Sequence, residues 1–210
     1  MKEYDVYLFD FDGTLFDTRL SLRAVWKAAF GAIGQTVTEE ESDEFMHHNL
    51  YEILVIRNLE KKDYAAFGHA LTEALDAPET VSKNIPFPET LEVLQTLFDQ
   101  GKRIGLVSGN SAKHIHLVWD YWKFPSISDC FMGCDVYKKG KPDPEPLLMA
   151  LDTMGEKQGG RIVYIGDSLQ DIEAADAAKM DSYLIDREDA YPDFKREKIT
   201  SLKDLLSFIQ

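Results

Sequence analysis

The sequence predicts an α/β fold, in which a parallel sheet is flanked by helices and an all-α segment is inserted after the first strand. Two observations support this class. Short apolar runs alternate with helical patterns over most of the 210 residues, as in parallel sheets that are covered by helices. The alternation stops after the first strand, and only helical patterns follow over residues 17–83.

Four apolar runs predict the strands of the sheet. Each run is nearly continuous, as expected for strands that are buried on both faces. A fifth run, "CFMGCD" from Cys130, is a weaker candidate. The four runs are "DVYLFDF" from Asp5, "RIGLVSG" from Arg103, "RIVYIGD" from Arg161 and "SYLIDR" from Ser182.

Helical patterns separate these strands. "PETLEVLQTLFDQG" has Pro88 near its start, leucines at helical spacing and Gly101 as its predicted end. "DPEPLLMALDTMG" has prolines in its first turn and Gly155 at its end. "SLQDIEAADAAKM" begins with Ser168 as a predicted N-cap, and "SLKDLLSFI" predicts a helix at the end of the chain.

The inserted segment predicts a second, all-α unit. Its four helical stretches are "DTRLSLRAVWKAAFGAIG", "EEESDEFMHHN", "LYEILVIRNLE" and "KKDYAAFGHALTEALD". The segment ends at "KNIPFP", where each proline favours extended backbone in the residue before it. We therefore expect an α/β core made of residues 1–16 and 84–210, and a helical unit made of residues 17–83.

Composition excludes several classes of partner. The net charge is −14, from 37 acidic and 23 basic residues, and no Lys/Arg cluster could neutralise a nucleic-acid backbone. No apolar run reaches the ~18 residues of a membrane span, and the start "MKEYDVYLFDFDG" is too acidic for a signal peptide. We therefore expect a cytoplasmic protein. Cys130 and Cys134 are expected to be reduced rather than to form a disulfide or a metal site.

Polar residues follow three of the predicted strands at the points where the strands end. "YLF" leads to Asp10, "GLV" leads to Ser108, and "VYIG" leads to Asp167. In an open, Rossmann-like parallel sheet the carboxyl ends of the strands meet at one edge, where ligands bind. Residues that are far apart in sequence are therefore expected to form one site.

The residue types at this edge indicate phosphate chemistry assisted by a metal. Asp10, Asp12 and Asp167 would repel one another unless they share a proton or a cation. Carboxylate oxygens suit Mg²⁺, which also binds substrate phosphates. Lys141 stands just before a helix that begins with prolines, so its ammonium is expected to be held at a fixed point. Further donors to phosphate oxygens are predicted at Gly13, Thr14, Ser108, Gly109 and Asn110.

Four motifs occur in a characteristic order, namely "DFDGT" from Asp10, "SGN" from Ser108, "KPDP" from Lys141 and "GDSLQD" from Gly166. With these motifs the sequence resembles the haloacid dehalogenase superfamily of phosphohydrolases. The helical insertion resembles the C1 cap of the subfamily that includes phosphoglycolate phosphatases and β-phosphoglucomutases. The resemblance implies a Mg²⁺-dependent enzyme that acts on a small-molecule phosphate ester, and it leaves a monomer and a homodimer both open.

The resemblance also implies a role for each motif residue. Asp10 matches the nucleophile that forms an aspartyl-phosphate, and Asp12 matches the general acid and base. The implied Mg²⁺ ligands are the Asp10 side chain, the Asp12 main-chain carbonyl and the Asp167 carboxylate. Asp171 is implied either as a further ligand or as a residue that contacts the ligands without binding the ion. The positions that hold the phosphoryl group in the family are matched by Thr14, Ser108 and Lys141.

The helical insertion is expected to close over the site and to contact the group that is esterified to phosphate. Asp17 is either the N-cap of the first inserted helix or a residue that faces the substrate. For the other candidates the alternative is a solvated helix face. These candidates are Arg19, Arg23, His47, His48, Asn49 and Arg57.

The same motif residues also fit other functions. A phosphomutase would use the same pair of aspartates, and a non-catalytic binding protein could keep the fold. Halide-releasing dehalogenation is disfavoured because that branch of the superfamily lacks the second aspartate, which here is Asp12. The sequence leaves phosphoglycolate, a sugar phosphate, a nucleoside monophosphate and pyrophosphate open as substrates.

Overall fold

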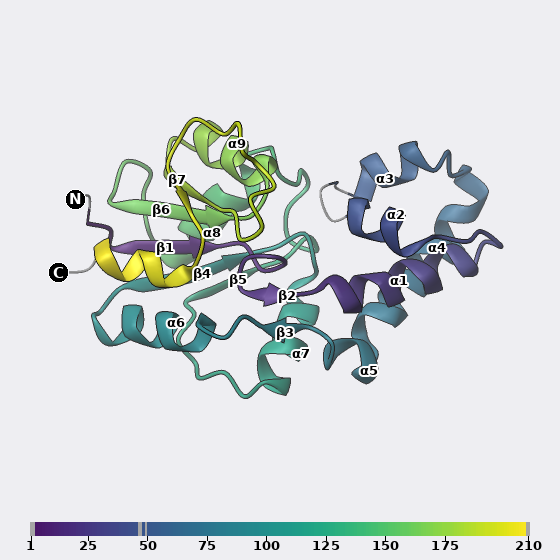
Figure 1. Ribbon diagram of the computed structural model, residues 1–210, viewed down its shortest axis with the longest axis horizontal. Coiled ribbons are helices and arrows are strands. Elements are labelled where there is room, and N and C mark those ends of the chain that lie inside the picture. The colour runs from purple at the N-terminus through teal and green to yellow at the C-terminus, as the bar shows by residue number, and fades with distance from the viewer. Residues whose placement is uncertain (1–2, 46–47, 49, 209–210) are drawn as a thin grey trace. The chain divides into compact units, whose positions relative to one another are not determined.

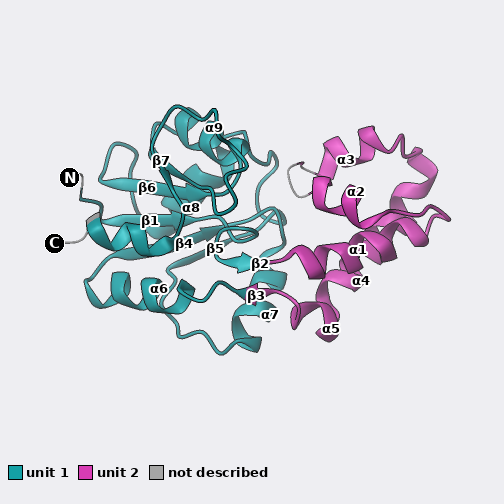
Figure 2. Ribbon diagram, viewed as in Figure 1, with its two compact units in different colours: residues 1–16, 86–210 teal, residues 17–85 magenta. Residues whose placement is uncertain are grey.

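A computed structural model describes residues 3–45, 48 and 50–208 of the chain. It divides into two compact units (Figures 1 and 2). Residues 1–16 and 86–210 form the first unit, and residues 17–85 form the second. The two connecting segments, β2 (Phe16–Asp17) and β3 (Ile85–Pro86), pair as a two-stranded sheet.

The first unit is built around a six-stranded sheet with the order β5-β4-β1-β6-β7-β8. Every neighbouring pair of strands is parallel, which confirms the predicted α/β class. Three of the four predicted runs contain a whole strand, "SYLIDR" contains all of β7 except its first residue, and "CFMGCD" contains β5. The short β8 was not predicted. The strands are β1 (Val6–Phe9), β4 (Arg103–Val107), β5 (Cys130–Met132), β6 (Ile162–Gly166), β7 (Asp181–Ile185) and β8 (Lys198–Ile199).

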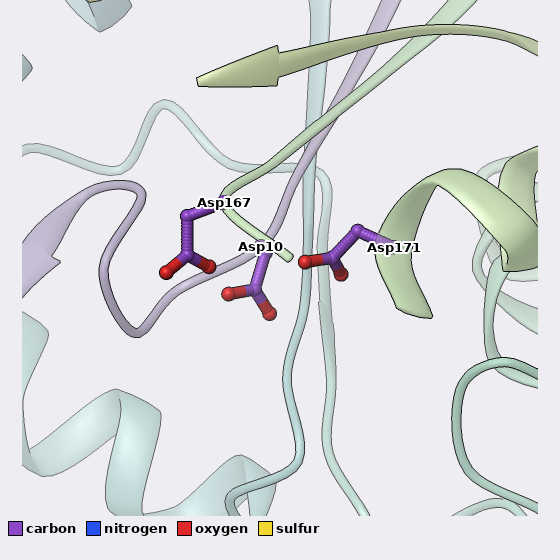
Figure 3. A group of neighbouring side chains, drawn as sticks. All are labelled: Asp10, Asp167 and Asp171. Carbon is purple, nitrogen blue, oxygen red and sulfur yellow. The ribbon is translucent and has the colours of Figure 1, made fainter. Parts of the chain in front are cut away.

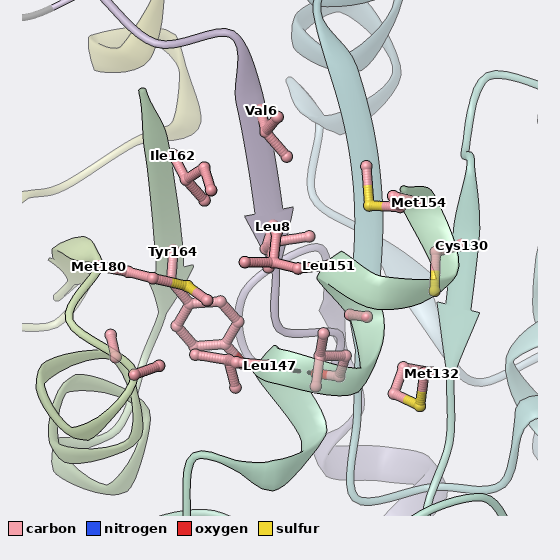
Figure 4. Close-up of a cluster of buried hydrophobic side chains, with 14 of the residues drawn as sticks. Val6, Leu8, Cys130, Met132, Leu147, Leu151, Met154, Ile162, Tyr164 and Met180 are labelled. Carbon is pink, nitrogen blue, oxygen red and sulfur yellow. Dashed lines mark hydrogen bonds between the residues drawn. The ribbon is translucent and has the colours of Figure 1, made fainter. Parts of the chain in front are cut away.

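Side chains along each strand point alternately to the two faces of the sheet, so the apolar core lies on both faces. Val6 and Leu8 of β1 and Tyr164 of β6 pack in one cluster with Leu147 and Ala174, which belong to the helices described below (Figure 4). Because successive side chains point to opposite faces, the buried Tyr7 and Phe9 lie on the other face. The strands are thus buried on both sides, as their apolar runs predict.

Five helices accompany the sheet within the described residues. They are α6 (Thr90–Asp99), α7 (Ala112–Tyr121), α8 (Glu145–Met154), α9 (Leu169–Ala177) and the 3₁₀ helix η3 (Leu202–Phe208). Gly155 ends α8 in the left-handed conformation, and Ser168 caps α9, as predicted. The helix predicted at the end of the chain is present as the 3₁₀ helix η3.

Within its described residues, the second unit contains helices and no strand besides its connecting segments. Its small core consists mainly of aromatic side chains, among them Trp26, Phe30, Phe45 and Phe67. Thr18 occupies the N-cap position of the first helix, so the alternative that placed Asp17 there is wrong. The helices are α1 (Arg19–Gly31), α2 (Glu39–Glu44), α3 (Leu50–Ile56), η2 (Lys61–Asp63), α4 (Tyr64–Asp76) and α5 (Pro78–Val81).

The helices of both units are short. Among the described residues, no helix combines the length and the apolar composition that a membrane span requires.

Candidate active site

The register of the sheet brings the predicted motifs to one edge. Phe9 at the end of β1 pairs with Leu106 of β4 and with Ile165 of β6, so these three strands end at the same level. Asp10 and Asp167 therefore leave the sheet side by side, and the first turn of α9 adds Asp171. Carboxylate oxygens of these three residues lie within 4.8 Å of one another (Figure 3).

Lys141 lies against two of these carboxylates. Its Nζ atom donates to Asp10 Oδ1 at 2.5 Å and to Asp171 Oδ1 at 2.6 Å. Only 12% of the Lys141 side chain is exposed, so water screens these ion pairs little. The ammonium therefore has the fixed position that the neighbouring prolines predict.

Asp12 lies in a different environment from Asp10. Its Oδ2 atom accepts from Asn110 Nδ2 at 2.8 Å and from Ser108 Oγ at 3.2 Å. Ser108 Oγ also accepts from the backbone amide of Asn110 at 3.0 Å. Ser108 and Asn110 were predicted as phosphate donors, and in this structure they hold the Asp12 carboxylate.

The turn after Asp12 is packed tightly against Asp167. Gly13 has a φ of +72°, and a β carbon on it would lie 2.1 Å from Asp167 Oδ2, so only glycine fits. The Gly13 amide donates to the carbonyl of Phe16 within the turn. Thr14 is buried, and its Oγ1 atom has no hydrogen-bond partner among the described residues. The hydroxyl of Thr14 can thus serve a bound anion.

Asp171 is fully engaged by the protein. Its Oδ1 atom accepts from Lys141 and lies 3.0 Å from the Tyr164 hydroxyl, and its Oδ2 atom accepts from Ser168 Oγ at 2.6 Å. A β carbon on Gly166 would lie 2.3 Å from Asp171 Cγ. The carboxylate is therefore held from several sides, which suits a group that orients Lys141.

Burial and mutual repulsion dominate the electrostatics of the three carboxylates. Burial raises the pKa of Asp10 and opposes the nearby Lys141 ammonium, while Asp171 and Asp12 raise it further. Burial, followed by Asp10 and Asp171, also raises the pKa of Asp167 well above its ordinary value. Carboxyl groups so arranged hold a proton or a cation between them. An all-oxygen donor set of this kind fits Mg²⁺.

Comparison with known proteins identifies the family. The sequence pattern of haloacid dehalogenase-like hydrolases matches residues 7–185, which include all four motifs. The chain belongs to this hydrolase family. That membership confirms the resemblance drawn from the motifs.

Relatives of this hydrolase carry phosphatase names. It is 28% identical over 185 residues to a phosphoglycolate phosphatase of Psychrobacter arcticus, and the match covers 83% of this chain and 80% of that protein. It is 26% identical over 222 residues to a phosphoglycolate phosphatase of Nitrosococcus oceani, with 99% and 98% covered. A haloacid dehalogenase-like protein of Bacteroides fragilis superposes with a TM-score of 0.85 at 26% identity, covering 97% and 100%.

Two groups at the site of this hydrolase were not predicted from the sequence. The Tyr164 hydroxyl lies 3.0 Å from Lys141 Nζ, and Arg187 donates to the carbonyl of Thr14 at 3.1 Å and to Glu89 at 2.6 Å. A tyrosine in an otherwise aliphatic buried strand was one available signal, because a buried phenol usually finds a partner. Arg187 follows the last predicted strand, in the same way that Asp10 follows the first.

The candidate substrate contacts of the helical unit are paired within that unit. Arg19 pairs with Asp17, and His48 lies 3.2 Å from Glu52. Two further arginines also have acidic partners, Arg23 with Glu39 and Asp43, and Arg57 with Glu41. His47 and Asn49 lie outside the described residues. The four described candidates thus have partners of their own, as solvated helix faces often do.

Proposed function

We propose that this haloacid dehalogenase-like hydrolase is a phosphatase that cleaves small-molecule phosphate monoesters through a phosphoryl group carried on Asp10. The observation that carries the proposal is the contrast between two neighbouring aspartates. Asp10 lies 2.5 Å from the Lys141 ammonium, whereas Asp12 contacts the neutral donors Asn110 and Ser108. A nucleophile needs the first environment, and a group that carries a proton needs the second.

In the first step a carboxylate oxygen of Asp10 attacks phosphorus. The bond between phosphorus and the ester oxygen breaks, and protonated Asp12 gives its proton to the departing oxygen. The Lys141 ammonium favours the ionised form of Asp10 against the effect of burial, and it offsets the negative charge that the phosphoryl group brings. The products of this step are a free alcohol and an aspartyl-phosphate.

In the second step water attacks the phosphorus of the aspartyl-phosphate. Asp12, now a carboxylate, takes a proton from the water, and the bond between phosphorus and Asp10 breaks. Inorganic phosphate leaves, and both aspartates return to their starting protonation states. Asp12 can serve as acid and then as base because its Oδ2 atom accepts from the neutral donors Asn110 and Ser108, which are compatible with either protonation state.

We place Mg²⁺ beside Asp10 and Asp167, with the main-chain carbonyl of Asp12 as a third ligand. When bound, the ion supplies positive charge that neutralises a phosphate oxygen. Asp171 fits better as the partner of Lys141, because both of its oxygens are already bonded within the protein. Thr14 Oγ1 and the motif residues Gly13, Ser108, Gly109 and Asn110 are proposed to complete the phosphate site.

The proposed substrate class is that of phosphoglycolate, a small and strongly anionic ester. Support comes from the two relatives named phosphoglycolate phosphatase. The helical unit, residues 17–85, is proposed to contact the alcohol part of the ester, because a lid of this kind can exclude water and select a substrate.

The direct test measures release of inorganic phosphate from a generic aryl phosphate, with Mg²⁺ and with excess chelator. Wild-type protein should be active only with Mg²⁺, and Asp10→Asn should lower kcat by at least about 10³-fold, because the nucleophile is lost. Asp193→Asn, a change at an exposed acid, is the matched control. Activity retained by Asp10→Asn would refute the nucleophile, and a requirement for a sugar bisphosphate activator would indicate a phosphomutase.

A panel of phosphate esters then defines the substrate. Values of kcat/KM should be highest for phosphoglycolate, because specificity is a ratio of these values. A clear preference for a sugar phosphate or a nucleoside monophosphate would overturn the substrate class but leave the reaction intact.

A further inference from the structure

Among the residues that the structure describes, the ammonium of Lys141 has three acceptors, as many as it has protons. An ammonium group carries three N–H donors and no acceptor. Lys141 Nζ lies 2.5 Å from Asp10 Oδ1, 2.6 Å from Asp171 Oδ1 and 3.0 Å from the Tyr164 hydroxyl oxygen. Two acceptors are carboxylates of the site, and the third is a neutral phenol from the middle of β6.

The Tyr164 hydroxyl links Lys141 to Asp171. Its single proton has two acceptors within reach, Asp171 Oδ1 at 3.0 Å and the carbonyl of Val107 at 3.5 Å. The carboxylate is both closer and charged, so it takes the proton. The oxygen of the hydroxyl then accepts from Lys141, and the three side chains form a closed set of hydrogen bonds.

The phenol is a rigid anchor. Its ring is fully buried in the core cluster and packs among the side chains of Leu147 and Met180 (Figure 4). Burial and the neighbouring Asp171 raise the pKa of Tyr164 far above its ordinary value, so the side chain is neutral. A lysine has a long, flexible stem, and two carboxylates alone leave its ammonium free to turn about the line between them.

We propose that Tyr164 is a positioning residue whose hydroxyl, as the third acceptor of the Lys141 ammonium, fixes the direction from which that ammonium contacts Asp10. Its kinetic consequence rests on the proposed function. Without this acceptor, one buried N–H of Lys141 loses its partner and the ammonium shifts relative to the attacking oxygen of Asp10.

The first test is kinetic and uses Tyr164→Phe, which removes one oxygen and no charge. The expected result is a kcat lowered about tenfold with KM within about twofold, since the hydrogen bond from Lys141 and the hydrogen bond to Asp171 are both lost. The matched control is Tyr7→Phe on the neighbouring strand β1. Tyr7 is also buried, but its hydroxyl has no hydrogen-bond partner within the described part of the chain, so both constants should stay within about twofold.

Two kinetic results would overturn the inference. An unchanged kcat would show that the third acceptor does not matter for the reaction. A lower KM with unchanged kcat would show that the Lys141 N–H that loses its partner in Tyr164→Phe binds the phosphate group instead, so Tyr164 would affect binding and not positioning.

The second test does not depend on activity. Brief labelling with an amine-reactive reagent, followed by digestion and mass spectrometry, measures how accessible each lysine is. Labelling of Lys141 should rise several-fold in Tyr164→Phe and not in Tyr7→Phe, relative to Lys139, whose side chain is 72% exposed. Unchanged labelling of Lys141 would overturn the inference, even if the wild-type protein hydrolysed no ester and the proposed function failed.

Discussion

At the scale of single residues, the site depends on two glycines as much as on its acids. Gly13 leaves room for the carboxylate of Asp167, and Gly166 leaves room for that of Asp171. In both places a β carbon would overlap the acid at less than 3 Å. The motif glycines are therefore needed for close packing, and at Gly13 also for a positive φ.

Gly166→Ala should separate steric packing from backbone strain, because Gly166 does not have a positive φ. The added methyl group would displace Asp171 and, through it, Lys141. We expect kcat to fall about 100-fold, since displacements near 1 Å at a reacting group have effects of that size. Gly68→Ala is the control, because nothing lies within 4 Å of the added carbon. Normal activity in Gly166→Ala would contradict the role given to Asp171.

The environment of Asp12 gives a second prediction at this scale. Asn110→Asp keeps the shape of the side chain but replaces the amide that donates to Asp12 Oδ2 at 2.8 Å with a carboxylate. Two carboxylates at this distance repel, so we expect Asp12 to turn away or to share a proton, and kcat to fall about 100-fold. Asn58→Asp, at an exposed position with φ of +49°, makes the same chemical change elsewhere and should leave kcat unchanged. Wild-type activity in Asn110→Asp would show that this amide does not hold Asp12 for the reaction.

At the scale of secondary-structure elements, Glu89 joins three segments. It stands at the start of α6, and its Oε1 atom accepts from Arg187 after β7, from Ser201 Oγ and from the amide of Leu202 in η3. Arg187 also packs over the ring of Phe87 at 3.7 Å and donates to the carbonyl of Thr14. One buried ion pair thus connects the end of the chain to the turn that follows Asp10.

Glu89 also predicts how stability depends on pH. Although burial acts to raise it, hydrogen bonds from Arg187 and backbone amides lower the pKa of Glu89 in the folded state. A lowered pKa stabilises the fold fully above the unfolded value of 4.5, and this contribution is lost as the pH falls through the folded value. Glu89→Gln should therefore destabilise the protein by about 2 kcal/mol at pH 7 and by less below about pH 4.

Urea unfolding of wild type and variant at several pH values measures this difference. Glu92→Gln is the matched control, because Glu92 lies on the same helix and pairs with Lys203 at 2.8 Å in an exposed position. The control should change the free energy of unfolding by less than about 0.5 kcal/mol. An equal loss for Glu89→Gln at pH 7 and pH 4 would show that the charge of Glu89 does not contribute.

The strands and the strand-end acids are specified by a few adjacent residues each, whereas other contacts join residues that are far apart in sequence. Continuous apolar runs predicted the main strands, and the polar residues at strand ends predicted the meeting of Asp10 with Asp167, because both signals lie in a few adjacent residues. The pair of Glu89 and Arg187 joins residues 98 positions apart, and no local pattern specifies such a partner. The sequence predicted a helix at η3 but not its 3₁₀ type, because the two types share the same residue preferences in a segment of only seven residues.

At the scale of the whole molecule, the net charge of −14 works against a site that must receive an anion. Three carboxylates cluster at the carboxyl edge of the sheet, and Lys141 supplies one positive charge among them. The folded protein without metal therefore contains concentrated repulsion, which an unfolded chain relieves. A divalent cation that binds this cluster should stabilise the fold, because the site does not exist in the unfolded chain.

Thermal unfolding with and without Mg²⁺ tests this expectation. At 100 times its dissociation constant, a ligand specific for the folded state adds about 2.7 kcal/mol, which raises the Tm of a protein of this size by about 5 to 10 °C. Asp167→Asn should abolish the rise. It should also unfold at a higher Tm than wild type without metal, because it removes one partly buried, repelling carboxylate whose pKa is raised. Asp193→Asn, at an exposed acid, should behave as wild type in both conditions. A rise in Tm that persists in Asp167→Asn would mean that the cation binds elsewhere, and the cluster of Asp10, Asp167 and Asp171 would then have to be explained by shared protons alone.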